Sequence, residues 1–350
     1  MREYFLSLVR GERRGLWPAL QRGGLCALSV PYGWAVGLRN WLYTRGWKHV
    51  ARVSVPVVSV GNLTLGGTGK TPCVEYIARF YRERHVRVAI LSRGYGSDDG
   101  RNDEARLLED NLPDVPHLQG PDRAGLAATA VAELDSEVLV LDDGFQHRRL
   151  HCDLDIVLID ATAPWGYDYL FPRGLLREAP ASLRRADIVV LTRCDQVDAA
   201  TVESLRQRVG RVAPAAGLVE TSHRPVSWIN ADKTTRPLED IRGRPVAALC
   251  GIGNPDAFHR TLLQLGLDVQ VLRSFPDHHA YTREDVEDLR SWARQQLGDC
   301  VVVTTQKDLV KVPLTTLGNR ELWALRIELK VHTGAELIEA RLQEVLGHRT

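Results

Sequence analysis

A glycine-rich segment that ends in Gly69-Lys70-Thr71 directly follows the apolar run 56–60. A strand that breaks into such a turn just before a helix is the arrangement of a phosphate-binding P-loop, in which backbone N–H groups surround phosphate oxygens. We expect Lys70 to reach the outer phosphates of a nucleoside triphosphate and the Thr71 hydroxyl to bind Mg²⁺. The residues predicted to bind the nucleotide are Gly66, Gly67, Thr68, Gly69, Lys70 and Thr71.

The loop is a variant P-loop, because the strict pattern has glycine where this chain has Thr64. The alternative is a glycine-rich turn that precedes a helix and binds no ligand. The strand in front of the loop and the Lys70-Thr71 pair at its end favour a nucleoside triphosphate site.

Two consecutive carboxylates, Asp142 and Asp143, follow the apolar run 137–141. A carboxylate at the end of such a strand is typical of a Walker B site, where it lies within reach of a Mg²⁺ ion that bridges nucleotide phosphates. Thr71, Asp142 and Asp143 are therefore the predicted metal-binding residues. The alternative for either aspartate is a helix N-cap.

Further candidate residues lie outside these two motifs. Asp103-Glu104 belongs to the polar stretch 97–110, where an acidic pair is usually solvated. The segment 275–281 contains Asp277, His278 and His279, a combination that suits a base with its orienting partner or, less well, a metal site. In the segment 172–178, Arg173 and Arg177 could hold a phosphate or pair with Glu178.

Two segments that follow strands, 192–195 and 304–308, are weakly similar to the guanine-binding signal of GTPases. The segment 251–255 lacks the third glycine of a dinucleotide-binding motif, so we interpret it as a turn and a helix start.

Composition excludes several protein classes. Lys and Arg number 45 and Asp and Glu number 44, so no excess of positive charge favours a nucleic-acid partner. The six cysteines show no metal-ligand spacing and are expected to be reduced thiols. The polar and charged residues 1–14 do not resemble a cleavable signal peptide, so the catalytic body is expected in the cytoplasm.

The first fifty residues carry eight Lys or Arg against two Glu, and four of the eight Trp. The uncharged run 23–38 would span roughly 24 Å as a helix, which is shorter than the roughly 30 Å hydrocarbon core of a bilayer, and Pro31 would interrupt it. Interleaved Trp and Arg favour a helix that lies on a membrane surface through residues 16–47. The alternative is a helix packed on the protein core.

The remaining pattern alternates strands with helices and predicts an α/β fold: a P-loop NTPase with a doubly wound parallel sheet. We expect a basic helical segment at 1–50, a nucleotide-binding core at 51–232 and a smaller α/β domain at 233–350 that closes over the active site. The stretch 97–110 is expected to be a mobile loop, and 231–237 a linker. The strands expected after the P-loop are 86–91, 137–141, 155–159, 187–191, 245–250, 269–273, 301–304 and 322–327, and the helices are 70–84, 201–212, 255–265, 283–297 and 334–346.

Taken together, these segments resemble the tetraacyldisaccharide 4′-kinases of lipid A biosynthesis, which also have Thr at the first P-loop glycine. The resemblance covers about residues 17–312. The segments that carry it are 60–72, 92–96, 142–147, 172–178, 251–255, 275–278 and 306–308.

The resemblance implies ATP- and Mg²⁺-dependent phosphorylation of the 4′-hydroxyl of a lipid A disaccharide 1-phosphate, giving lipid IVA, at the cytoplasmic face of the inner membrane. It implies that Asp103 is the catalytic base, with His278 as its partner, and that the substrate lies between two domains. The residues flanking Asp103-Glu104 depart from the family pattern, and Gln306 replaces a family glutamate. The candidate substrate residues are Arg93, Gln146, His147, Arg173, Arg177 and Glu178.

Two other hypotheses remain open at this point. The first is a P-loop GTPase or ATPase switch that drives assembly or metal delivery, which the segment 192–195 supports best. The second is a membrane-bound interaction protein whose P-loop is structural. Phosphate transfer to a glycolipid distinguishes the kinase from both.

Overall fold

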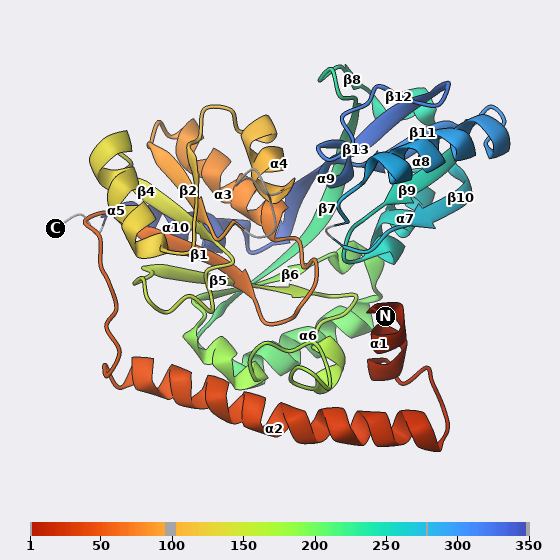
Figure 1. Cartoon of the computed structure of the whole chain (residues 1–350). Coiled ribbons are helices and arrows are strands. Elements are labelled where there is room, and N and C mark those ends of the chain that lie inside the picture. Colours follow the sequence, from red (N-terminus) through yellow and green to blue (C-terminus); the bar gives the residue numbers. More distant parts are fainter. Residues whose placement is uncertain (1, 95–102, 278, 348–350) are drawn as a thin grey trace. The chain divides into compact units, whose positions relative to one another are not determined.

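The computed structural model describes residues 2–94, 103–277 and 279–347. The chain divides into two compact units that are each assembled from separate segments. Unit 1 comprises Met1–Gly94, Asp114–Ser222 and Val331–Thr350, and unit 2 comprises Tyr95–Pro113 and His223–Lys330. Figure 1 shows the elements of both units along the chain.

Unit 1 is built on a parallel sheet in the order β7-β6-β5-β1-β4-β2-β3. Its strands are β1 (Val57–Asn62), β2 (Val88–Ser92), β3 (His117–Gln119), β4 (Val138–Asp142), β5 (Leu154–Asp160), β6 (Ile188–Thr192) and the first part of β7 (Gly217–Ile229). Every residue of β1, β2, β4 and β6 is buried. These apolar runs are therefore central strands that helices cover on both faces.

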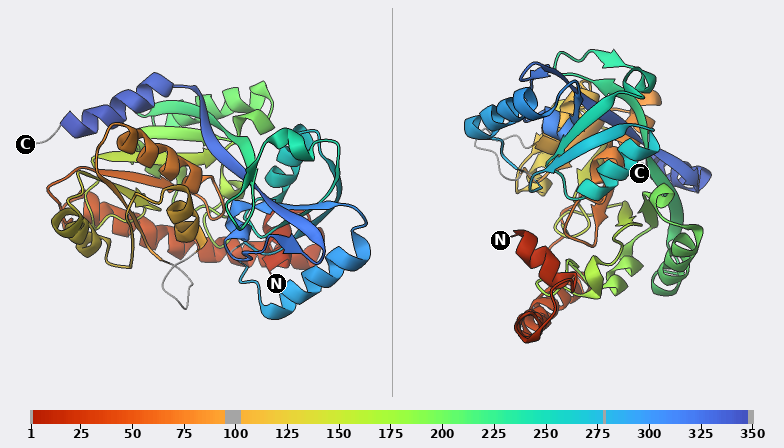
Figure 2. Two further views of the ribbon diagram at one scale, coloured as in Figure 1. Left: turned by 90° about the horizontal axis from the view of Figure 1, so that it is seen from above. Right: turned by 90° about the vertical axis from the view of Figure 1, so that its right-hand side faces the viewer.

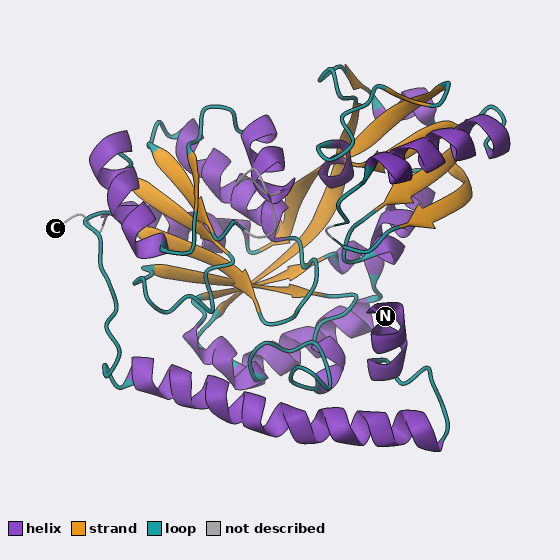
Figure 3. Cartoon of the chain, in the orientation of Figure 1, coloured by secondary structure: helices purple, strands orange, loops and turns teal. Residues whose placement is uncertain are grey.

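The helices of unit 1 supply that cover, as Figure 3 shows in purple beside the orange strands. Helix α3 (Lys70–Glu83) packs on β1, β2 and β4, while α5 (Arg123–Leu134) packs on β2 and β3. Helix α6 (Ala199–Val212) packs its buried Val202, Leu205 and Val209 with residues of β5 and β6. Helix α10 (Ala335–Gly347) also belongs to this unit, and Figure 2 shows it in blue. Three short 3₁₀ helices are η1 (Gly166–Asp168), η2 (Pro180–Arg185) and η3 (Cys194–Gln196).

Five strands of unit 1 end on a buried polar residue. These residues are Asn62, Ser92, Asp142, Asp160 and Thr192, each at most 5% exposed. Because the strands are parallel, their carboxyl ends meet at one edge of the sheet, which is where open α/β sheets bind ligands. The P-loop follows β1 at that same edge.

Two helices precede the sheet of unit 1, α1 (Arg2–Val9) and α2 (Leu16–Thr44). Helix α2 is a single rod along one side of the unit (Figure 1). Two of its contacts lie near the middle of the helix: Ser29 Oγ donates to the Leu170 carbonyl at 2.9 Å, and the Tyr32 hydroxyl donates to the Arg177 carbonyl at 2.9 Å.

The helix continues through Pro31, so the expected interruption there is wrong. Proline in a helix interior costs about 3 kcal/mol because it removes one backbone hydrogen bond and crowds the preceding turn. The contacts of Ser29 and Tyr32, on either side of the proline, offset that cost.

Unit 2 is a smaller α/β unit whose strands lie in the order β10-β9-β11-β13, with parallel neighbours. Its strands are β8 (Thr235–Arg236), β9 (Pro245–Cys250), β10 (Asp268–Ser274), β11 (Val301–Thr305), β12 (Thr316–Leu317), most of β13 (Arg320–Thr333) and the second part of β7. Its helices are α4 (Asp103–Asn111), η4 (Leu238–Ile241), α7 (Pro255–Gln264), α8 (Arg283–Gln296) and α9 (Gln306–Leu309). Helix α7 packs with Val246 and Ala248, whereas α8 packs with the intervening Ala247 and Leu249. Because alternate residues of a strand point to opposite faces, the two helices cover opposite faces.

The structure differs from the expected elements in several places. Residues 103–110 of the stretch 97–110, expected to be a mobile loop, belong to α4, because Ala105 and Leu108 bury one face of that helix; residues 97–102 lie outside the described part of the chain. Strand β7 was not expected, and its hairpin with β8 occupies the expected linker at 231–237. Three segments also group differently from the expected domain bounds: 95–113 and 223–232 belong with unit 2, and 331–350 belongs with unit 1.

Candidate active site

The P-loop of unit 1 begins with a short stretch of paired backbone. Thr64 forms a bridge with Leu176, and the Leu65 N–H donates to the Leu175 carbonyl at 2.7 Å. An extended, paired residue needs no glycine, which explains Thr64 at the variant position. Glycine is required further on, where Gly66 and Gly69 have φ of 119° and 89°.

Lys70 begins α3, and its ammonium group lies among polar groups from the strand ends. The Lys70 Nζ atom is 3.4 Å from Asp143 Oδ1 and 3.4 Å from Asn62 Oδ1. Arg177 holds the same aspartate, with Nη1 at 2.9 Å from each carboxylate oxygen. Gln146 donates to the Asn62 carbonyl at 2.9 Å. The structure thus brings together Lys70, Asp143, Gln146 and Arg177, all singled out in the sequence.

Two cations fix the charge of Asp143. Burial opposes ionisation of this carboxyl group, but the charges of Lys70 and Arg177 outweigh it and lower the pKa of Asp143 to about 2. Asp143 has φ of 53°, directly after β4 ends at Asp142. An ionised carboxylate beside the P-loop lysine is the arrangement expected of a Walker B residue.

The residues around the P-loop suit a nucleotide with Mg²⁺. In the described part of the chain, the buried Thr68 Oγ1 atom has no hydrogen-bond partner, so the loop holds a polar atom that a ligand can satisfy. No group of three or more His, Cys, Asp or Glu side chains among the described residues could hold a metal ion. Mg²⁺ is commonly held by one or two carboxylates together with substrate phosphates, so Thr71, Asp142 and Asp143 fit that ion.

The segment 192–195, which resembles a guanine-binding signal in sequence, holds the P-loop. The Thr192 hydroxyl donates to the Thr68 carbonyl at 2.9 Å, and Arg193 Nη1 donates to the Gly67 carbonyl at 3.1 Å. Arg193 also forms a short ion pair with Asp160, at the end of β5. These contacts orient the loop from its protein side.

Of the candidate substrate residues, Arg93 and His147 remain near the strand ends of unit 1. Arg93 is exposed. Burial, together with the charges of Arg123, Arg149 and Arg93, lowers the pKa of His147 to about 4, so His147 is neutral at pH 7.

Arg173 and Glu178 have contacts that dock the N-terminal helices. Arg173 donates to the Val9 carbonyl through Nη1 at 3.2 Å. The Glu178 side chain is fully buried, and its carboxylate accepts from Arg39 at 3.1 Å, from Asn40 at 2.8 Å and from Arg185 at 3.0 Å. A carboxylate in this setting anchors α2.

In unit 2, Asp103 is the first residue of α4 and its side chain is 8% exposed. Its Oδ2 atom lies 3.0 Å from Lys311 Nζ, and Glu104 lies 3.0 Å from Lys307 Nζ. Asp103-Glu104 is therefore an ion-paired, largely buried pair rather than a solvated one. His278 lies outside the described residues. Its neighbour His279 stacks on Phe275 and contacts Asp285, which caps α8.

Comparison with known proteins decides the family. The model of the tetraacyldisaccharide-1-P 4′-kinase family, LpxK, matches residues 22–346. The chain belongs to the LpxK family.

Relatives and a solved structure of LpxK agree with this assignment over nearly the whole chain. A tetraacyldisaccharide 4′-kinase of Anaeromyxobacter dehalogenans (strain 2CP-C) is 42% identical over 351 residues, which cover 95% of this chain and 92% of the relative. One of Geobacter sulfurreducens is 36% identical, with 98% and 99% covered. The crystal structure of LpxK from Aquifex aeolicus in complex with ATP is 30% identical, with a TM-score of 0.72 and 93% and 99% covered.

Membership of the LpxK family confirms the predicted resemblance, the α/β P-loop fold and the class of enzyme, a kinase that uses ATP. It does not favour a GTPase or ATPase switch. Motif analysis missed three groups of site residues: Asn62, the Arg193–Asp160 pair, and the lysines Lys307 and Lys311. Lys311 alone of these carried no signal in the sequence: Asn62, Asp160 and Arg193 are polar residues at or next to a strand end, and Lys307 lies in the segment 304–308 that follows a strand.

Proposed function

We propose that this chain transfers the γ-phosphoryl group of ATP to the 4′-hydroxyl of tetraacyldisaccharide 1-phosphate, giving lipid IVA. The observation that carries the proposal is Lys70 at the start of α3, ion-paired with Asp143, in a chain that the LpxK family matches over 22–346. A P-loop lysine beside an ionised strand-end carboxylate is the arrangement that phosphoryl transfer uses.

The nucleotide side of the reaction belongs to unit 1. Gly66 to Thr71 hold the phosphates, and Lys70 stabilises the negative charge that develops on the transferred group. Thr71, Asp142 and Asp143 would hold Mg²⁺, which would neutralise part of the negative charge of the phosphates. Arg177, which keeps Asp143 ionised, and Gln146 complete this side.

The acceptor side of the reaction belongs to Asp103, with His278 as its partner. A sugar hydroxyl is a poor nucleophile at neutral pH, so a positioned base that takes its proton typically contributes about 10²–10⁴-fold. Arg93, His147 and Arg173 are the groups we assign to substrate contacts. For Glu178, the anchoring of α2 is the better supported role.

The test is transfer of label. Protein, ATP labelled in its γ-phosphate, Mg²⁺ and a tetraacylated disaccharide 1-phosphate are incubated in detergent, and label is followed on the lipid and in free phosphate. We expect labelled lipid from the wild type and little from Lys70→Ala. Free phosphate without labelled lipid would instead support an ATPase, and wild-type turnover by Lys70→Ala would refute the P-loop assignment.

We also propose that α2 docks the enzyme on the cytoplasmic face of the inner membrane through residues 16–47. In the described part of the chain no helix is long and apolar enough to cross a membrane. Large apolar side chains nevertheless stay exposed along α2, among them Trp17 at 68%, Leu20 at 67% and Trp34 at 76%. At about 100° per residue they fall on one side of the helix, away from the docked Ser29 and Asn40.

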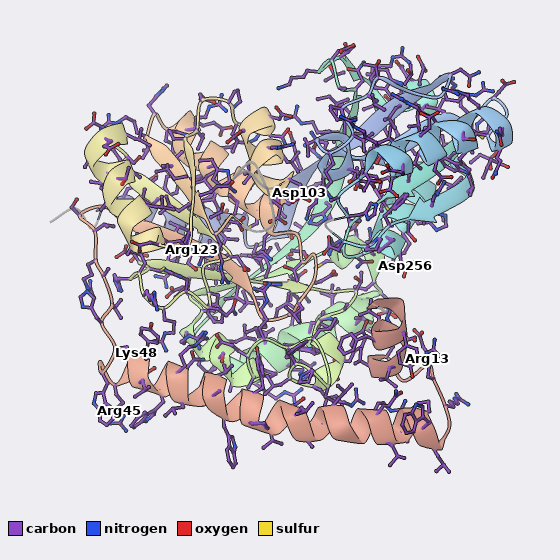
Figure 4. All side chains as sticks on the ribbon, viewed as in Figure 1. Arg13, Arg45, Lys48, Asp103, Arg123 and Asp256 are labelled. Atoms are coloured by element: carbon purple, nitrogen blue, oxygen red, sulfur yellow. The ribbon has the colours of Figure 1, made fainter. Side chains whose placement is uncertain are left out.

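Basic residues flank this apolar stripe. Figure 4 labels Arg13 before the start of α2, and Arg45 and Lys48 just after its end. Apolar side chains that enter the headgroup region, flanked by cations that attract anionic lipid, are the composition of an in-plane membrane helix.

Vesicle sedimentation tests the docking. Trp17→Ser with Trp34→Ser is expected to reduce binding to vesicles that contain anionic lipid, with ATP affinity unchanged. Leu263→Ser is the matched control, because Leu263 is an exposed apolar residue of α7, 51% exposed, outside the stripe. Equal vesicle binding by the double variant and the control would contradict the proposal.

A further inference from the structure

Unit 2 contains a cluster of buried charges around the first turn of α4. Lys307 Nζ lies 3.0 Å from Glu104 Oε1 and 3.9 Å from both Asp103 Oδ2 and Asp277 Oδ1. Lys311 Nζ lies 3.0 Å from Asp103 Oδ2 and 3.9 Å from Asp308 Oδ1. The two lysines thus form ion pairs with four carboxylates.

Both lysines come from one short element. Lys307 belongs to α9 and Lys311 follows it one turn later, so at a spacing of four residues they share a face. Their side chains are only 17% and 13% exposed. Helix α4 packs on α9, and Gln306 donates to Asn111 Oδ1 at 3.1 Å at the opposite end of α4.

The base of α9 is held rigidly, which fixes where the lysines point. Asp308 is 1% exposed and accepts from the Thr305 hydroxyl at 2.6 Å, the Gly251 N–H at 2.9 Å and the Tyr281 hydroxyl at 3.1 Å. Gly251 is needed for this approach, because a Cβ atom there would lie 2.9 Å from Asp308 Oδ1.

Burial of two ammonium groups is costly unless anions compensate for it. Burial alone would lower the pKa of Lys307, but Glu104, Asp103 and Asp277 outweigh it and raise that pKa above its usual value. Lys307 therefore stays charged. Because the carboxylates outnumber the two lysines, the cluster is not a site for an anionic ligand.

We propose that Lys307 and Lys311 are positioning residues for Asp103: they keep its carboxylate ionised and oriented to accept the proton of the sugar hydroxyl. The inference rests on the proposed role of Asp103 as the base. Asp103 Oδ1 accepts the Glu104 N–H at 3.1 Å and Oδ2 faces Lys311, which fixes the plane of the carboxylate.

Among the described residues, the charged groups of the cluster around Asp103 are Glu104 on its own helix, Lys307, Lys311 and Asp308 from α9 and the turn after it, and Asp277 from the turn after β10. Removal of one lysine leaves Asp103 facing a net negative surrounding, which raises its pKa. Since a protonated Asp103 cannot act as a base, the acidic limb of the kcat–pH profile moves to higher pH.

The experiment measures kcat and the KM for ATP from pH 5 to 9 in Lys311→Met, Lys307→Met and Lys311→Arg. We expect Lys311→Met to move the acidic limb upward by about one unit, since an opposite charge this close typically shifts a pKa by about 1–3 units. The KM for ATP should change less than twofold, and Lys311→Arg should restore the wild-type limb. The matched control is Lys233→Met, because Lys233 pairs at 2.7 Å with Asp110 on the same helix but is 65% exposed.

A double-mutant cycle separates positioning from folding damage. In an Asp103→Asn background, Lys311→Met should lower kcat no further, because the group that it positions is already absent. The positioning role is overturned if the acidic limb of the kcat–pH profile stays at the wild-type pH in both Met variants. It is also overturned if Lys311→Met lowers kcat by the same factor in the wild-type and the Asp103→Asn backgrounds. Near-normal kcat in Asp103→Ala would instead refute the proposed base itself, whatever the lysine variants do.

Discussion

Arg193 offers the sharpest test of how the P-loop is held. Its guanidinium group donates to the Gly67 carbonyl at 3.1 Å and pairs with Asp160, and the two side chains are only 10% and 6% exposed. Replacing Arg193 with Met keeps most of the side-chain length but removes every donor. Asp160 then remains buried without its cation, and the Gly67 carbonyl loses this donor.

Breaking a buried ion pair by removing one partner typically costs about 3–5 kcal/mol. Asp160 Oδ1 keeps hydrogen bonds from the Thr162 N–H at 3.0 Å and the Thr162 hydroxyl at 2.7 Å, so we expect the lower end, about 3 kcal/mol. The hydrogen bond from a charged donor to the P-loop carbonyl is worth about 1.5–3 kcal/mol. Because the loop is no longer held in its binding conformation without this bond, we expect the affinity for ATP to fall roughly tenfold or more.

Urea unfolding and calorimetric ATP titration measure the two effects separately. The control is Arg341→Met, because Arg341 pairs with Glu344 at 3.0 Å but the two side chains are 43% and 54% exposed, and exposed pairs are typically worth less than about 1 kcal/mol. The Arg193→Met, Asp160→Asn double variant should lose less stability than the sum of the single variants. If Arg193→Met loses no more stability than the control and binds ATP normally, the proposed anchoring is wrong.

Three further predictions concern unit 1. Burial raises the pKa of Asp155 to about 6, so its charged form is disfavoured in the folded state. Asp155→Asn should therefore be more stable than the wild type above pH 6, and this gain in stability should shrink as the pH falls from about 6 to about 4. Urea unfolding at a series of pH values measures the gain. Glu178→Ala should lose about 3–5 kcal/mol and speed amide exchange in α2, because Arg39 and Arg185 lose their shared carboxylate. Gly61→Ala should lower the melting temperature, because its Cβ would lie 2.6 Å from Phe145 Cβ, whereas Gly210→Ala, with no atom within 4 Å, should not.

The parts of the fold predicted from sequence are those whose signals are local. The P-loop, the central strands and the helices that follow them combine an apolar run with a turn or cap within a few residues, as at Val57–Asn62 followed by Gly69-Lys70. Strand β7 lacks such a signal, since Glu220, Ser222 and His223 interrupt its apolar pattern.

The site was predicted in part for the same reason. Lys70, Asp142 and Asp143 lie in recognisable motifs, whereas Lys311 matters only because Asp103, which is distant in sequence, lies beside it in the folded unit. The same holds for Glu178, which a sequence motif suggests as a substrate group but which the fold surrounds with Arg39, Asn40 and Arg185. Contacts across such separations leave no trace in the local pattern.

Helix α10 has a consequence for the order in which the chain folds during synthesis. The Tyr81 hydroxyl on α3 donates to the Leu342 carbonyl at 3.0 Å, and Ile338, Leu342 and Val345 are buried in unit 1. A nascent chain that has left the ribosome only as far as Ser222 therefore has the whole parallel sheet of unit 1 but lacks the helix that covers Tyr81. The apolar surface beneath α10 stays open to water until all of unit 2 has been made, so the final closure of the nucleotide-binding unit awaits a segment encoded more than a hundred residues later.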